Sequence, residues 1–401
     1  MESIDEYWNS FQNMNLDSDH AKKIKTVLEK ANFTHLCSEA TKIRREKSID
    51  GLTCSVNIAK FTYGTYNLVI ALTFSDKIQW IARIMLPQDE DDLVSEDPTN
   101  EDVTKSLLSE IASMNYIRSK TTIPIPRVFG HSVTKNAFGH PYILMEALQG
   151  TVLENRMALS IPDTHKRKFA AQFAGYIYEL GTLQFPKIGS LSYESNELEI
   201  TPFQISSSWI NPLSSSLEYS YLFRKAETKE IHSEHPDVTD WAAAAWFLEK
   251  SLTSMVTEEH LYGPFPLCHL DLDYNNILVD EEFNITAVLD WSNTQTVPIE
   301  RFVVNPEFVA PPAAPEEYKR AVFEFRDIFV QELGRIEGRK DEDRGLSLSG
   351  LFGSSLAEVV FRCTCSPARR AVFDAQLTLA LTFGRDAKWE DFKKFFNGRL
   401  A

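Results

Sequence analysis

The sequence predicts an α+β protein with two lobes, a small β-rich lobe followed by a larger, mainly helical one. At 401 residues the chain exceeds the size at which a single hydrophobic core usually stops growing. Between residues 54 and 86, three runs rich in β-branched and aromatic side chains are typical of strands. Beyond Gly150, long runs without proline are typical of helices. We therefore expect a first lobe over residues 1–146 and a second over residues 147–401.

The first lobe is expected to be an antiparallel sheet with flanking helices. Runs bounded by turn residues predict its strands at residues 56–64, 65–74, 78–86, 127–133 and 140–148. Turns are expected at 75–77 and 136–139. One helix opens on Ser18 as a cap and runs to residue 31, and a second covers 106–120 and ends before Pro124.

The second lobe is expected to be helical apart from two short strands. Long helical runs cover 164–183 and 238–255, and the segment between them, 185–236, is interpreted as irregular. The short strands are expected at 275–280 and 285–291, separated by a turn at 281–284. The tail from Pro312 to Phe383 is predicted to be helical, with a break near Pro367.

Composition and charge restrict the class of protein. The 41 Lys and Arg residues against 57 Asp and Glu residues give a net charge of −16, which repels phosphate backbones and argues against a nucleic-acid partner. An acidic stretch over 87–102 is interpreted as a solvated loop. The N-terminus lacks the basic and apolar regions of a secretory signal, and no apolar run has membrane-spanning length. Five irregularly spaced cysteines indicate reduced thiols, so we expect a cytoplasmic protein without a membrane partner.

One short segment carries the pattern expected of a catalytic loop. In the run 267–280, His269, Asp271 and Asn276 fit H-x-D-x-x-x-x-N, the catalytic-loop pattern of kinases. The reaction of a kinase needs a carboxylate that takes the proton from the hydroxyl group being phosphorylated, and this is the role expected for Asp271. It also needs an amide oxygen nearby to bind a hard cation, which suits Asn276. His269 is interpreted as a residue that braces the loop.

A second carboxylate, Asp290, ends the next apolar run. Magnesium takes oxygen ligands and usually only one or two protein carboxylates, with phosphates and water completing its octahedron. Asn276 and Asp290 together meet that requirement, and they are the predicted metal ligands.

These motifs resemble the aminoglycoside phosphotransferase/choline kinase family, in which such a loop is followed by a hydrophobic strand that ends in Asp-Trp, here Asp290-Trp291. The sequence of residues 268–280 and 285–302 is similar to that of a branch common in filamentous fungi. The resemblance spans roughly residues 50–310 by order of elements. It implies a protein-kinase-like fold, a Mg²⁺-dependent transfer, and ATP or GTP as the phosphoryl donor.

The resemblance also implies a nucleotide site in the first lobe. Arg83 stands where the family has a phosphate-binding basic residue, and Glu110 matches the acid that pairs with it. Ile81 shares a strand face with Arg83 and would cover the base. The hinge that meets the purine edge matches residues 145–147, with Glu146 and Ala147 as its binding residues. The loop over the phosphates has one glycine, Gly64, and arginine replaces the usual lysine, which is not an interchangeable group.

Structural interpretations of the same residues remain open. Arg83 could pair with a solvent-facing acid, and Glu110 could be solvated on its helix. Several aromatic residues could line an acceptor pocket, although such side chains more often belong to a core. They are Trp209, Trp241, Trp246, Tyr219 and Tyr221.

The function predicted from these observations is transfer of the ATP γ-phosphoryl group to a hydroxyl of a small metabolite. Three alternatives are a nucleotide-binding scaffold without turnover, a protein kinase, and a donor that is GTP. The scaffold is disfavoured by the presence of Asp271, Asn276 and Asp290 together. A protein kinase is disfavoured because the chain has no D-F-G or A-P-E motif.

Overall fold

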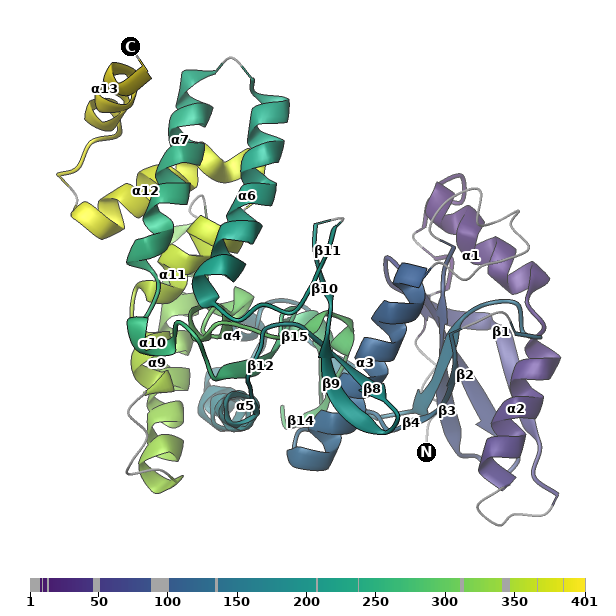
Figure 1. Cartoon of the computed structure of the whole chain (residues 1–401). Helices are drawn as coiled ribbons and strands as arrows, with labels where there is room; N and C mark the ends of the chain where they lie inside the picture. The colour runs from purple at the N-terminus through teal and green to yellow at the C-terminus, as the bar shows by residue number, and fades with distance from the viewer. Residues whose placement is uncertain are drawn as a thin grey trace. The chain divides into compact units, whose positions relative to one another are not determined.

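The computed structural model describes residues 8, 10–12, 14–45, 51–87, 101–133, 136–206, 208–236, 238–310, 314–340, 347–365, 367–384 and 386–400. Contacts divide the chain into two units, which are shown in Figure 1. The first is Met1–Thr151 with Thr286–Ser292, and the second is Val152–Ile285 with Asn293–Ala401. Most of the acidic stretch predicted to be a loop, residues 88–100, lies outside the described residues.

The first unit contains a five-stranded antiparallel sheet in the order β1-β2-β3-β5-β4. Its strands are β1 (Cys54–Tyr63), β2 (Asn67–Phe74), β3 (Gln79–Met85), β4 (Val128–Ser132) and β5 (Tyr142–Glu146). All five predicted strands are present. The turn predicted at 75–77 is also confirmed, since Phe74 N–H donates to the Ile78 carbonyl at 2.9 Å and Lys77 adopts φ 69°.

Helices cover both faces of this sheet (Figure 1). The helices α1 (Asp19–Lys30) and α2 (Phe33–Arg45) pack on the face that holds the core, and Ser18 caps α1 as predicted by accepting from Ala21 N–H at 3.2 Å. Trp80, Ala82 and Ile84 of β3 point into that core. The alternate residue, Arg83, points toward α3 (Glu101–Lys120) on the opposite face. The side-chain alternation of β3 thus separates a packing face from a polar face.

The second unit holds most of the described helices and several short strand pairings. Its strands are β7 (Gln184–Phe185), β8 (Ser190–Glu194), β9 (Glu197–Thr201), β10 (Phe203–Ile205), β11 (Ser208–Ile210), β12 (Phe265–His269), β13 (Ile277–Val279) and β15 (Thr294–Thr296), while β6 (Thr151–Val152) and β14 (Ile285–Val288) lie at the unit boundaries. Its first helices are α4 (Met157–Ser160), α5 (Asp163–Thr182), α6 (Ser216–Glu234), α7 (Thr239–Lys250) and α8 (Ile299–Phe302). β12 pairs with β15 and β7, β8 with β9, and β10 with β11.

The interpretation of residues 185–236 as irregular is wrong. The segment contains the hairpins β8–β9 and β10–β11 and the whole of α6. The helix was missed because its buried side is not a continuous apolar stripe, since it includes Arg224 with Tyr219 and Ile231.

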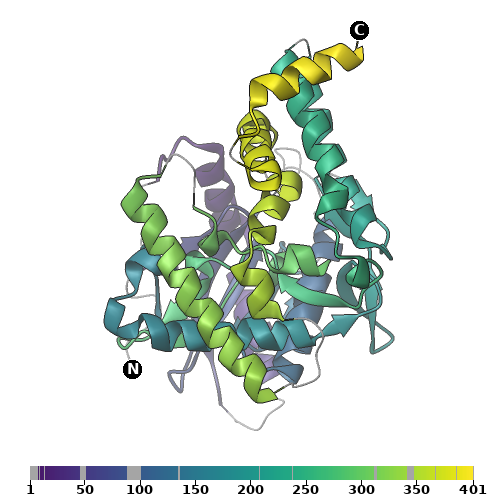
Figure 2. The same ribbon diagram turned by 90° about the vertical axis from the view of Figure 1, so that its left-hand side faces the viewer.

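The predicted helical tail is confirmed and continues beyond Phe383. Its helices are α9 (Glu316–Lys340), α10 (Leu348–Gly353), α11 (Leu356–Val360), α12 (Ala371–Phe383) and α13 (Trp389–Leu400), with a π-helical turn at Phe361–Cys365. The break predicted near Pro367 lies between that turn and α12. Figure 2 faces α5 and α9, which pack against each other through Phe169, Phe173, Phe325 and Phe329. Among the described helices, none has both the length and the apolar character required to cross a bilayer.

Candidate active site

A buried charged cluster lies on the polar face of the first unit. Arg83 of β3 forms an ion pair with Glu110 of α3 through its Nη1, so the predicted pairing of these two side chains is present. The Nη2 of Arg83 lies 3.5 Å from Oδ1 of Asp290. The Glu110 side chain is 2% exposed and that of Arg83 is 12% exposed, whereas that of Asp290 is 43% exposed. Three residues far apart in sequence therefore meet, with the Asp290 carboxylate on the solvent side.

Burial and charge shift the pKa values of this pair. Burial alone would lower the pKa of Arg83, but the carboxylates of Glu110 and Asp290 outweigh it and raise that pKa above its ordinary value. For Glu110, burial raises the pKa, the Arg83 guanidinium opposes this, and the nearby Asp290 charge adds to the rise. Arg83 thus stays cationic at any working pH.

Asn67 completes the hold on Arg83, and sequence reasoning missed it. With the Asn67 amide oriented so that both groups are satisfied, its Oδ1 accepts from Arg83 Nη2 at 3.0 Å and from Nε at 3.2 Å. Asn67 is the first residue of β2 and closes the loop that begins at Gly64, whose N–H donates to the Asn67 carbonyl at 2.9 Å. The phosphate-loop candidate and the Arg83 cluster are therefore joined through one residue.

The packing around position 64 would allow a residue larger than glycine. A Cβ at this position would meet no atom within 4 Å. A glycine with open space around it suits a loop whose backbone a ligand approaches closely.

The hinge candidate follows β5. The N–H of Glu146 donates to the Arg127 carbonyl at 2.9 Å, and its carboxylate accepts from Arg127 N–H at 3.1 Å. Ala147 is the first residue after the strand, and among the described residues its N–H makes no backbone hydrogen bond. The backbone N–H of Glu146 is thus engaged, whereas that of Ala147 is available for a further hydrogen bond.

Local structure explains how Asp290 is presented. The chain leaves β14 through Val288, whose N–H donates to the Pro124 carbonyl at 2.9 Å. Trp291 is buried, and its indole Nε1 donates back to the Val288 carbonyl at 2.9 Å. Between them Asp290 has φ 55°, in the left-handed region that residues other than glycine, asparagine, aspartate and histidine rarely adopt. Ser292 Oγ donates to its Oδ1 at 2.7 Å, so the Asp-Trp pair is a fixed turn that holds one carboxylate outward.

The catalytic-loop candidate belongs to the second unit. His269 ends β12 and is 5% exposed, and its Nδ1 accepts from the Asp271 N–H at 3.2 Å, which agrees with a bracing role. Asn276 donates through Nδ2 to the Asp271 carbonyl at 2.7 Å. Because the Asn276 nitrogen is engaged inside the loop, its Oδ1 is the atom suited to a cation. Asp271 itself is exposed.

Two further residues, Asn305 and Glu307, hold the same loop from behind. Asn305 is 5% exposed, and its Nδ2 donates to the Leu272 carbonyl at 3.2 Å. Glu307 is 1% exposed and accepts from Met157 N–H at 2.7 Å and from Tyr274 N–H at 3.4 Å. Burial raises the pKa of Glu307. Sequence reasoning missed both residues, since a lone Asn and a lone Glu thirty residues downstream carry no recognisable signal.

We expect Asn305→Ala to lower kcat about tenfold, on the scale of ~1–3 kcal/mol for a buried hydrogen bond left unmade. The Leu272 carbonyl loses its donor, and the backbone beside Asp271 loses its support. The KM for the nucleotide should not change. The matched control is Asn284→Ala, which removes an amide bonded to Asp280 in a surface turn. Steady-state kinetics of both variants, recorded well below their melting temperatures, measure these changes in kcat. An equal loss of kcat in both variants would contradict the bracing role of Asn305.

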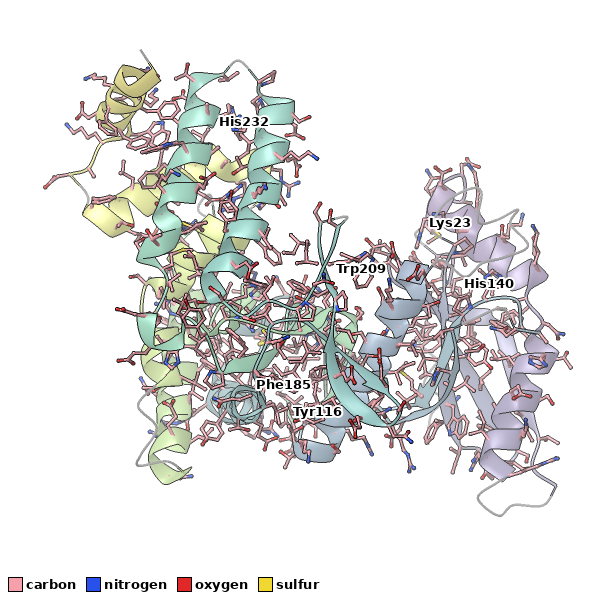
Figure 3. The ribbon with its side chains drawn as sticks, viewed as in Figure 1. Lys23, Tyr116, His140, Phe185, Trp209 and His232 are labelled. Carbon is pink, nitrogen blue, oxygen red and sulfur yellow. The ribbon has the colours of Figure 1, made fainter. Side chains whose placement is uncertain are left out.

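The aromatic residues considered for an acceptor pocket divide into packed and accessible groups. Tyr219 is 1% exposed and stacks on Phe203, while Trp241 stacks on His235 and Trp246 packs against Phe392. Tyr221 is 44% exposed. Trp209 lies on the hairpin β10–β11, as Figure 3 shows. Tyr219 is thus a core residue of the helical unit, and Trp241 and Trp246 are partly buried and pack against that core. Trp209 and Tyr221 are the remaining candidates.

The candidate residues fall in two groups. Arg83, Glu110 and Asp290 come together in the first unit, and His269, Asp271 and Asn276 come together in the second. Within the described residues, no group of three or more His, Cys, Asp or Glu side chains is placed to hold a metal.

Comparisons with known proteins place the chain among phosphotransferases. The model of a family described as the phosphotransferase enzyme family matches residues 58–299, well over half of the chain. A subtelomeric hrmA-associated cluster protein of Aspergillus fumigatus is 31% identical over 144 residues, covering 36% of this chain and 26% of that protein. The clavilactone A biosynthesis cluster protein Y of Ampulloclitocybe clavipes is 29% identical over 247 residues, covering 56% of this chain and 57% of that protein. The matches thus span between about a quarter and just over half of these relatives' lengths.

A solved structure matches the fold. The crystal structure of a candidate aminoglycoside phosphotransferase from Ralstonia eutropha has a TM-score of 0.53 at 14% identity, covering 88% of this chain and 99% of that chain. At this identity the match concerns the fold alone. It confirms the protein-kinase-like α+β fold predicted from the resemblance.

Proposed function

The chain belongs to the phosphotransferase enzyme family, and we propose that it transfers the γ-phosphoryl group of a nucleoside triphosphate to a hydroxyl group of a small metabolite. The observation that carries the proposal is the cluster of Arg83, Glu110 and Asp290, in which a fixed guanidinium lies beside an outward carboxylate. Phosphoryl transfer depends mainly on positioning and on neutralising charge, and these are the groups that such a reaction needs.

In this proposal the first unit binds the donor. Arg83, held by Glu110 and Asn67, contacts the α- and β-phosphates with its planar fork. The Gly64 loop covers the phosphates, Ile81 lies against the base, and the hinge at Glu146 and Ala147 meets the purine edge. Either ATP or GTP satisfies these contacts.

The second unit supplies the acceptor side. Asp271 orients the acceptor hydroxyl and takes its proton late in the transfer, because the transition state is loose. His269 and Asn276 hold the loop so that the Asp271 carboxylate keeps one position. The acceptor is a small hydroxylated compound bound by the helical unit.

The chemistry of the donor atoms on Asn276 and Asp290 suits a magnesium ion. The Oδ1 of Asn276 and the Asp290 carboxylate are hard oxygen ligands, and the Asn276 nitrogen is already engaged. When bound, magnesium would offset charge on the phosphates.

We expect Asp290→Asn to weaken magnesium-dependent nucleotide binding by about ten- to hundredfold in Kd, the scale of roughly 1.5–3 kcal/mol for one contact to a charged group. Asparagine tolerates the left-handed backbone at this position, so the turn should be kept. Calorimetric titration with and without magnesium checks this. The variant should bind metal-free nucleotide as well as the wild type does, and an unchanged magnesium dependence would remove Asp290 from the metal site.

The experiment that tests the proposed function is nucleoside-triphosphate turnover by the full chain with magnesium, with and without a pool of small hydroxylated metabolites. Acceptor-stimulated turnover together with a product heavier by one phosphate supports the proposal. Tight nucleotide binding without turnover on any pool would favour a nucleotide-binding scaffold instead. Absence of nucleotide binding would contradict the donor site.

A further inference from the structure

A pair of thiols lies in the first unit, away from the candidate active site. Cys37 is on α2 and Cys54 is the first residue of β1, two elements that pack against each other. Both are free, both are half-buried, and both contact the edge of the first unit's core. Neither has a role in the proposed phosphoryl transfer.

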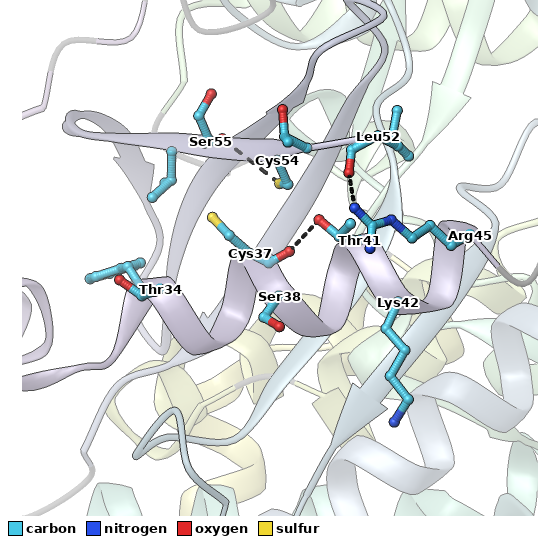
Figure 4. Close-up of a pocket in the computed structure, with 12 residues that line it drawn as sticks. Thr34, Cys37, Ser38, Thr41, Lys42, Arg45, Leu52, Cys54 and Ser55 are labelled. Atoms are coloured by element: carbon cyan, nitrogen blue, oxygen red, sulfur yellow. Dashed lines mark hydrogen bonds between the residues drawn. The ribbon is translucent and has the colours of Figure 1, made fainter. Parts of the chain in front are cut away.

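Both cysteines line one open cavity of about 860 Å³. Figure 4 shows the sulfur atoms of Cys37 and Cys54 directed toward each other across it. The other lining residues include Thr34, Ser38 and Thr41. A cavity of this size admits a small-molecule reagent, whereas Cys268 and Cys363 are buried.

The two thiols differ in acidity. The neighbouring Cys54 side chain lowers the pKa of the Cys37 thiol, and burial only partly opposes this. The pKa of Cys54 is raised by the same contact and by burial. Because the thiolate is the reactive form, Cys37 is suited to attack and Cys54 to follow it.

We propose that Cys37 and Cys54 form a redox-modification site, a dithiol that low-molecular-weight disulfides convert reversibly into a disulfide between α2 and β1. The Cys37 thiolate attacks one sulfur of the reagent, whose S–S bond breaks, and one thiolate leaves as the mixed disulfide forms. Cys54 then loses its proton, attacks the Cys37 sulfur and displaces the second thiolate. Two electrons pass from the protein to the reagent, and the thiol protons end on the two released thiols.

The test is incubation of the full chain with glutathione disulfide, followed by alkylation of remaining thiols and peptide mass mapping. The wild type is expected to lose two alkylatable thiols and to yield a linked pair of peptides containing Cys37 and Cys54. In Cys54→Ser the reaction should stop at one glutathione on Cys37, because the resolving thiol is gone. In Cys37→Ser the rate of modification at Cys54 should fall at least tenfold.

A matched control moves the first thiol by one position. The double variant Cys37→Ser/Ser38→Cys keeps the number of cysteines on the same helix, but neighbouring helical residues point about 100° apart. Ser38 is directed away from Cys54 in Figure 4, so no link to Cys54 is expected. A link at equal yield in this control would overturn the proposal. So would a wild type that keeps both thiols, or that accumulates a stable glutathione adduct on Cys37. These outcomes do not depend on whether the chain transfers phosphate.

Discussion

Replacing Asp271 by asparagine is expected to lower kcat by roughly 10²–10⁴-fold, the usual contribution of a positioned general base. Asparagine keeps the size of the side chain and removes its negative charge and its ability to accept a proton. The loop should remain in place, because its shorter bonds, from Asp271 N–H and to the Asp271 carbonyl, are made by the backbone, and the long contact from Asn276 Nδ2 to Asp271 Oδ2 can still be accepted by the amide oxygen. Nucleotide affinity should stay close to that of the wild type, since Asp271 is not among the residues proposed to bind the nucleotide or the metal. Asp271→Ala should behave in the same way.

Asp273→Asn is the matched control for this loss. Asp273 lies two residues further along the loop and accepts from Asn275 N–H at 2.9 Å as a helix cap, a role that asparagine fills equally well. Its kcat should be close to that of the wild type. Comparable kcat values for Asp271→Asn and Asp273→Asn would exclude Asp271 as the base.

Truncation of Glu110 to alanine is expected to be the most destabilising single change at the donor site. It leaves the charged Arg83 guanidinium buried without this carboxylate. A guanidinium keeps its proton in proteins, so the free-energy cost of the buried charge cannot be relieved by deprotonation. Breaking a buried pair in this way costs roughly 3–5 kcal/mol in the free energy of unfolding. Nucleotide affinity should fall as well, because Arg83 loses the partner that orients it. Chemical denaturation and nucleotide titration measure the two effects.

The reciprocal variant, Arg83→Met, should be less destabilising and pH-dependent. A buried carboxyl can take up a proton, and burial already raises the pKa of Glu110 above its ordinary 4.5. The folded state then binds the proton more tightly than the unfolded state, so stability is highest at low pH and falls as pH rises through the raised pKa. Equal stability losses for Glu110→Ala and Arg83→Met at neutral pH would contradict this account.

Much of the fold could be predicted because its signals are local. Strands β2 and β3 are dense in β-branched and aromatic residues, and α1 begins at a serine cap followed by an apolar stripe. Helix α6 could not be predicted in this way, since its buried side holds an arginine whose environment is set by distant helices. The stability of such a helix comes more from its tertiary packing than from the apolar pattern of its own sequence.

The candidate site was predictable in part for a similar reason. Asp271, Asn276 and Asp290 stand in short patterns, so residue spacing alone marks them. The meeting of Arg83 with Glu110 was expected only from the resemblance, because nothing in the sequence gives the distance between a strand and the following helix. Asn67, Asn305 and Glu307 act through one or two hydrogen bonds across the fold, and no local pattern distinguishes them from ordinary polar residues.

The measurement that tests the central claim most directly follows a labelled γ-phosphate from nucleoside triphosphate during incubation of the wild type with magnesium and an acceptor pool. Phosphotransferase activity predicts that the label moves to an organic product in equal amount to the nucleoside diphosphate formed, and that Asp271→Asn forms almost none. Two results would contradict phosphotransferase activity with Asp271 as the base. One is that the label appears only as inorganic phosphate, at a rate that no acceptor changes. The other is that wild type and Asp271→Asn transfer the label equally.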